Sequence, residues 1–150
     1  MARLMGGPYD LESLDLLPQP DASVILLSRI GGPADVLVAR LDRLRSLVGN
    51  GENVMEDHAL WAESREFSWV KGGKLLVKTA VTPQTLPALD RALQAANAPR
   101  RYAVGGNLAW IAWPDSAETC HQLLAQFGNS GLILQGDSQR ALIGAPLQTT

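Results

Sequence analysis

Lys74 to Gln135 reads KLLVKTAVTPQTLPALDRALQAANAPRRYAVGGNLAWIAWPDSAETCHQLLAQFGNSGLILQ, and this stretch determines the fold class. Side chains alternate between two faces from Lys74 to Thr82, which predicts a strand. Further strands are predicted at 101–104, 107–113 and 131–135, with Gly105-Gly106 as the bend of a hairpin. Two segments between the strands carry apolar residues at helical spacing: Leu86, Leu89, Leu93 and Ala96, then Cys120, Leu123, Leu124 and Phe127.

The resulting order of strand, helix, strand, strand, helix, strand is the ferredoxin-like βαββαβ arrangement. It predicts an α+β fold in which an antiparallel sheet carries its helices on one face. The other face must then be covered by something else or be exposed to water. A strand at Ser23–Ile30 and a helix at about Pro33–Val48 precede this core and predict an N-terminal β-α extension. The apolar, β-branched composition of Ser23–Ile30 leads us to expect a strand covered on much of both faces.

Proline and glycine suggest how the chain is divided. Residues 1–22 contain Gly6-Gly7-Pro8 and Pro18-Gln19-Pro20, and we expect an extended lead-in. The domain proper is expected at 23–137, with its ferredoxin-like core at 74–135. Residues 138–150 are expected to form a polar tail.

Composition restricts the class of protein. The 150 residues are 46% hydrophobic and 19% charged, which is typical of a globular domain, and the net charge of -2 argues against a nucleic-acid partner. No apolar run is long enough to span a membrane. A single cysteine and the lack of a signal peptide pattern favour a reducing, cytoplasmic location.

The usual chemical motifs are missing from the sequence. His58 and His121 are far apart, so we predict no metal site. Cys120 falls on the apolar stripe of a helix, where packing is the expected role. The glycine pairs at 31–32, 72–73 and 105–106 lack the spacing that cradles phosphate, and turns are the expected role for them.

Aromatic and arginine residues are more informative. Trp61 and Arg65 are four residues apart on a predicted helix at about 58–68, so they share a face, and an arginine beside an indole can present its planar guanidinium to a carboxylate. The alternative is a surface arginine that merely stacks on Trp61. Trp110 and Trp113 must lie on opposite faces of their strand. One of them can fill the helix-side core, and the other then lies on the opposite sheet face, where exposed tryptophan suggests docking.

Several short motifs resemble those of a known family. They are RLMGGPYD at 3–10, LLP at 16–18, the strand-and-helix segment 23–45, LWAESR at 60–65, GGNLAW at 105–110 and LQGD at 134–137. Together they resemble the C-terminal, or cap, domain of FAD-linked oxidases, with the closest likeness to the FAD-binding E subunit of bacterial glycolate oxidase.

The resemblance implies a function and a set of partners. It implies a cap built on a large antiparallel sheet that closes over a flavin and shapes a pocket for a 2-hydroxy acid such as glycolate. FAD would be held by a separate FAD-binding domain of the same parent protein, and residues 1–22 would be the interdomain junction that leads out of it. Sister flavoprotein and iron–sulfur subunits would be partners. This chain alone would not be catalytic.

The same resemblance suggests site residues. Arg65 is the candidate anchor for the substrate carboxylate and Trp61 its support. Trp110, Trp113 and Tyr102 are the candidates to face the flavin. Metal-using relatives carry histidines where this chain has Tyr102 and Ala109, which argues against metal-assisted proton abstraction.

Two other functions remain open from the sequence. The chain can be a self-standing ferredoxin-like module that binds a small molecule or dimerises, since such domains often pair their sheets or edges. It can also be a non-catalytic domain that assembles subunits.

Overall fold

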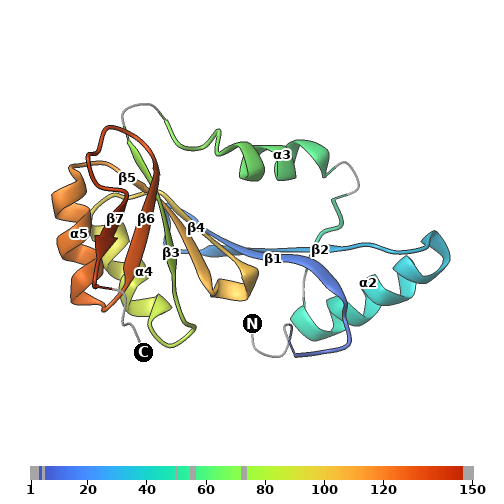
Figure 1. Cartoon of the computed structure of the whole chain (residues 1–150). Helices are drawn as coiled ribbons and strands as arrows, with labels where there is room; N and C mark the ends of the chain where they lie inside the picture. The colour runs from blue at the N-terminus through green and yellow to red at the C-terminus, as the bar shows by residue number, and fades with distance from the viewer. Residues whose placement is uncertain (1–3, 5, 50, 55–56, 72–73, 147–150) are drawn as a thin grey trace.

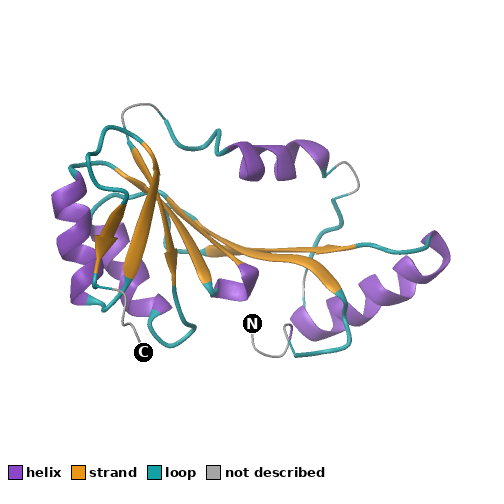
Figure 2. Cartoon of the chain, in the orientation of Figure 1, coloured by secondary structure: helices purple, strands orange, loops and turns teal. Residues whose placement is uncertain are grey.

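The computed structural model describes residues 4, 6–49, 51–54, 57–71 and 74–146. Within these residues, seven strands form one antiparallel sheet in the order β2-β1-β4-β5-β3-β6-β7 (Figures 1 and 2). The strands are β1 (Leu11–Pro18), β2 (Val24–Ile30), β3 (Leu75–Ala80), β4 (Arg100–Ala103), β5 (Leu108–Trp113), β6 (Ser130–Gln135) and β7 (Leu142–Gly144). The helices are α2 (Ala34–Val48), α3 (His58–Glu66), α4 (Leu86–Ala95) and α5 (Ala117–Gln126), with a short 3-10 turn η1 (Val104–Gly106).

The predicted βαββαβ core is confirmed. β3 pairs with both β5 and β6, and β4 pairs with β5, so the four core strands lie in the order β4-β5-β3-β6. Helices α4 and α5 follow β3 and β5 and cover one face of the sheet. The main core forms beneath them from fully buried side chains that include Val77, Leu89, Leu93, Ile111 and Leu124. The α+β fold class is therefore that expected from the sequence.

The lead-in predicted for residues 1–22 is wrong in one important respect. Leu11–Pro18 forms β1, which pairs with β2 along its length and with β4 at Leu16 opposite Tyr102. Within Ser13–Leu17, the side chains of Leu14 and Leu16 lie on the strand face toward the helices. The side chain of Asp15 lies on the opposite face. β1 therefore belongs to the domain and joins the N-terminal extension to the ferredoxin-like core.

The expected burial of the strand at Ser23–Ile30 is also wrong. β2 pairs only with β1 among the described residues and forms an edge of the sheet. Val24, Ile25 and Leu26 are 52%, 47% and 38% exposed. Its apolar composition was compatible with a central strand, but no element of the described chain covers this part of it.

The polar tail predicted for 138–150 contains another strand. Leu142–Gly144 forms β7, the opposite edge of the sheet, which pairs with β6. Ile143 is buried against the main core, and the Gly144 amide donates a 2.9 Å hydrogen bond to Nδ1 of His121 on α5. The last four residues lie outside the described part of the chain.

The helices lie on both faces of the sheet. α2 packs on the same side as α4 and α5, where Leu44 meets Leu14 of β1 in a second, smaller core. α3 lies over the other face (Figures 1 and 2). This places α3 and the strands beneath it on the side that the core helices leave free.

Candidate functional site

Arg101 of β4 holds α3 against the free face of the sheet, which is the face that α2, α4 and α5 do not cover. Its guanidinium donates a 2.6 Å hydrogen bond to Glu63 and a 2.9 Å hydrogen bond to the Ser64 hydroxyl, both on α3. It also lies 5.1 Å from the centre of the Trp69 ring in the segment after the helix. The Arg101 side chain is largely buried by these contacts. α3 is thus held at a defined position above β1 and β4.

An open hollow of about 420 Å³ lies between α3 and the sheet. Its floor and sides come from three strands and from α3 with its C-terminal cap. The lining residues are Ser13 and Asp15 of β1, Arg29 of β2, Trp110 of β5, and Trp61, Ser64, Arg65 and Phe67. The hollow therefore brings together Trp61, Arg65 and Trp110, three of the five residues proposed from the sequence.

The two arginines of the hollow differ in how far their charge is already paired. Arg29 lies 3.3 Å from Asp57 and 3.6 Å from Glu12, and its guanidinium is 6.0 Å from the centre of the Trp61 ring. The Arg65 side chain is 71% exposed, and its one salt bridge among the described residues is to the adjacent Glu66, at 3.7 Å. The cation over Trp61 is thus Arg29, while Arg65 remains free to bind a ligand.

Asp15 is the acidic group of the hollow. Burial raises the pKa of its carboxyl above the ordinary value, although the Ser13 hydroxyl and the Arg101 guanidinium act in the opposite direction. Arg101 is already committed to Glu63 and Ser64, and no salt bridge among the described residues involves Asp15. The chain therefore places a partly desolvated carboxyl group, which forms no salt bridge among the described residues, on the floor of the hollow.

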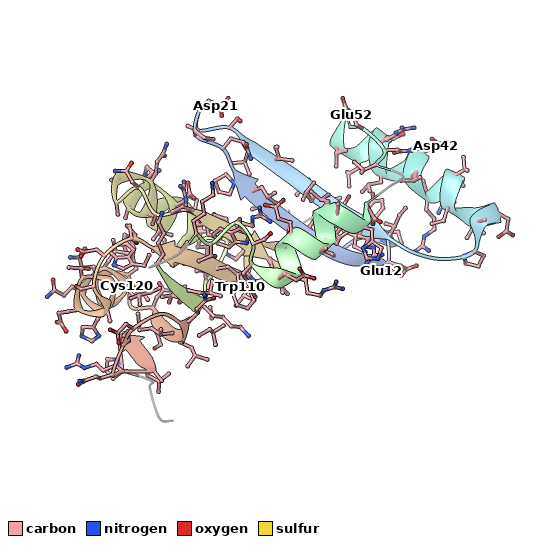
Figure 3. The ribbon with its side chains drawn as sticks, turned by 90° about the horizontal axis from the view of Figure 1, so that it is seen from above. Glu12, Asp21, Asp42, Glu52, Trp110 and Cys120 are labelled. Carbon is pink, nitrogen blue, oxygen red and sulfur yellow. The ribbon has the colours of Figure 1, made fainter. Side chains whose placement is uncertain are left out.

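Trp110 forms the aromatic end of the hollow. Its ring packs at 4.7 Å and a 56° tilt against Phe67, which caps the C-terminus of α3, and Nζ of Lys78 lies 5.4 Å from the ring centre. In Figure 3 Trp110 lies near one end of α3 and Glu12 near the other. The sequence prediction that one of the two strand tryptophans lies on the free sheet face is confirmed for Trp110.

Trp113 and Tyr102 were proposed as flavin-facing residues, and the structure contradicts both. The Trp113 side chain is 4% exposed and its indole N–H donates to the Ser116 carbonyl and the Thr119 hydroxyl. Tyr102 is 1% exposed and donates a 2.6 Å hydrogen bond to Asp90 of α4. Both side chains point to the helix-covered side of the sheet, where a ring supplied by another domain has no access.

Several residues of the hollow were not among those proposed from the sequence. Ser13 and Asp15 were overlooked because residues 1–22 were assigned to a lead-in, although their alternation with Leu14 and Leu16 was a strand signal. Phe67 adopts a left-handed backbone conformation, with φ of 53°, at the end of α3. Nothing in the sequence pattern indicates that this turn brings its ring onto Trp110.

The two described glycine pairs lie in connections between secondary-structure elements. Gly105 and Gly106 form a buried turn between β4 and β5, and the Gly31 carbonyl accepts a 2.6 Å hydrogen bond from Arg40. Gly105-Gly106 thus forms a turn as expected, Gly31-Gly32 lies in the connection between β2 and α2, and Gly72-Gly73 lies outside the described residues. The free face instead offers aromatic and charged side chains around an open hollow.

The described part of the chain contains no group of three or more His, Cys, Asp or Glu side chains placed to hold a metal ion. Among these same residues, no helix has both the length and the apolar character to cross a membrane.

Comparison with protein-family models, curated proteins and solved structures gives no significant match to this chain.

Proposed function

We propose that this chain is the cap domain of a FAD-linked oxidoreductase that acts on a 2-hydroxy acid. The observation that carries the proposal is the hollow between α3 and the free sheet face, which contains Arg65, Trp61 and Trp110. The motif resemblance implies a large antiparallel sheet, and the seven-stranded sheet agrees with that implication. In this proposal FAD is held by a separate domain, and this chain alone does not turn over substrate.

The residues of the hollow have distinct roles in this proposal. Arg65 binds the substrate carboxylate through its planar guanidinium. Arg29, held by Glu12 and Asp57, supports the Trp61 ring, which forms the adjacent wall. Bound FAD supplies the two-electron oxidising chemistry, and the chain orients the acid and limits the access of water to it.

The proposal is tested by joining the chain to the FAD-binding domain of a glycolate-oxidase-type flavoprotein. We expect glycolate or lactate to reduce the flavin in the absence of oxygen, and we expect Arg65→Ala to weaken apparent affinity by about tenfold or more. Arg91→Ala is the control, because Arg91 is exposed on α4, which covers the other face of the sheet. Unchanged affinity in Arg65→Ala would show that Arg65 is not the anchor.

The free edge of β2 favours a second candidate function, self-association. Val24, Ile25 and Leu26 are exposed on an edge strand that contains no proline or lysine, the residues that commonly protect such edges. Two copies pairing these strands antiparallel would bury the apolar side chains in an isologous contact. Light scattering of the purified chain then gives a dimer that Ile25→Lys converts to a monomer, and a monomeric wild-type chain contradicts this function.

A further inference from the structure

The hollow is larger and more aromatic than a two-carbon acid requires. Its volume of about 420 Å³ lies within the range of about 300–1,000 Å³ found for sites that bind drug-sized ligands. Three aromatic side chains line it: Trp61, Phe67 and Trp110. Glycolate offers no side chain to these rings.

We propose that the hollow recognises a 2-hydroxy acid with an aromatic or similarly large apolar side chain on its second carbon. The inference rests on the proposed function and goes beyond it by naming the class of substrate. The side chain of the acid packs among the three rings, while its carboxylate and hydroxyl meet Arg65 and Asp15.

The aromatic walls are fixed by contacts within the chain. Phe67 and Trp110 pack against each other at 4.7 Å, and Arg29 lies over Trp61 while pairing with two carboxylates. Arg101 fastens α3, which carries Trp61, to the sheet. Walls held in this way lose little side-chain freedom when a ligand binds, which favours affinity for an apolar group.

The polar side chains of the hollow indicate where the carboxylate and the hydroxyl of the ligand bind. Among the described residues, the one salt bridge of Arg65 is the exposed pair with neighbouring Glu66, so a ligand carboxylate meets an available guanidinium. The Asp15 carboxyl group lines the same hollow without a salt bridge among the described residues, and it can accept a hydrogen bond from the 2-hydroxyl. An aromatic acid without the hydroxyl would leave this group facing apolar atoms, so it should bind less well.

The test measures binding to the chain itself by nuclear magnetic resonance. The chain has four tryptophans, and the indole N–H signals of Trp61 and Trp110 report on the hollow. The Trp113 signal is an internal control, because its indole is hydrogen-bonded within the core. The probes are 3-phenyllactate, glycolate and 3-phenylpropionate, which separate the aromatic side chain from the hydroxyl.

We expect 3-phenyllactate to shift the Trp61 and Trp110 signals and to bind at least about tenfold more tightly than glycolate, since burying a phenyl group contributes at least this much. It should also bind several times more tightly than 3-phenylpropionate. Phe67→Ala should weaken the binding of 3-phenyllactate more than that of glycolate. Asp15→Ala should remove the preference for 3-phenyllactate over 3-phenylpropionate. Asp42→Ala, at an exposed position of α2, should leave this preference unchanged.

The possible outcomes separate this inference from the proposed function. Glycolate binding as tightly as 3-phenyllactate, with shifts at Trp61 and Trp110, overturns the inference and leaves the 2-hydroxy-acid site intact. If none of the acids shifts these two signals, the hollow is not an acid site and both proposals fail. The wild-type ligand series decides between these outcomes without any variant, so a variant that does not fold cannot obscure the result.

Discussion

The hydroxyl of Tyr102 lies 2.6 Å from Oδ1 of Asp90 and donates a hydrogen bond to it, which connects β4 to α4 across the main core. Arg100, two residues before Tyr102, binds both oxygens of the same carboxylate at 2.6 Å and 2.8 Å. Tyr102 therefore has a structural partner on the helix side of the sheet. The motif resemblance proposed Tyr102 as a flavin-facing residue. This network explains why its side chain is part of the core instead.

Replacing Tyr102 should measure the strength of this network. In Tyr102→Phe the ring still fills its place in the core, but a hydrogen bond to a charged group is lost, so we expect unfolding free energy to fall by about 2 kcal/mol. Urea denaturation followed by circular dichroism measures the change. A stability equal to wild type would mean that the contact contributes nothing, and Tyr9→Phe provides a comparison with a tyrosine outside this network.

The same network should make stability depend on pH. Although burial alone would raise it, the pKa of Asp90 is held below its ordinary value by hydrogen bonds from Arg100 and Tyr102. A lowered folded-state pKa means that the ionised carboxylate stabilises the fold above the unfolded-state pKa of about 4. This contribution is lost as the pH falls through the folded-state value. The difference in unfolding free energy between wild type and Asp90→Asn should therefore be constant near neutral pH and shrink below about pH 4. A difference that grows on acidification contradicts this assignment.

Cys120 should be chemically inert in the folded protein. Its side chain is fully buried, and burial raises the pKa of the thiol to about 12. The thiolate that reacts with alkylating and disulfide reagents is therefore scarce at neutral pH, and the sulfur is also out of reach. We expect labelling by a disulfide reagent to be slow in buffer and to accelerate through the unfolding transition in urea. Rapid labelling of the native chain would show that the α5 face opens.

Periodicity was sufficient to predict the core, because each of its elements satisfies a local rule. Leu89 and Leu93 on α4 and Cys120 and Leu124 on α5 are spaced for one helix face, and all four are buried as that spacing requires. The order of these elements then determined the fold class. The exposure of β2 could not be predicted in this way, since an apolar run gives no information about which strand will be its neighbour.

The candidate site was only partly predictable for a related reason. Trp61 and Arg65 were found because they share one helix face, a local relationship. Arg29 and Asp15 come from different strands. They line the same hollow because β1 pairs with β2, and this pairing could not be predicted from the local sequence pattern. Tyr102 was misassigned because a short motif gives no information about which face of a strand a residue occupies.

His121 should hold the edge strand β7 in place. Its Nδ1 accepts a 2.9 Å hydrogen bond from the buried Gly144 amide. His121→Phe leaves this N–H without its acceptor, which costs about 1–3 kcal/mol, and we expect the loss to appear locally because β7 is an edge. Hydrogen exchange should accelerate at Gly144 and Ala145 but not at β3. Gln122→Ala, on the neighbouring exposed position of α5, should leave these amides unchanged.

The ionised carboxylate of Asp15 should destabilise the folded protein, as is common for residues that serve a function. Because burial raises the pKa of its carboxyl, the ionised form is disfavoured in the folded state relative to the unfolded chain. Asp15→Asn removes this penalty, so we expect the variant to be more stable than wild type at neutral pH. The sign follows from linkage: the penalty is present above the folded-state pKa and disappears as the pH falls below the unfolded-state value of about 4. Denaturation of both proteins across this range measures the effect. If Asp15→Asn is less stable than wild type at neutral pH, the carboxylate is held by stabilising contacts, and it is then not free to accept the hydroxyl of a ligand.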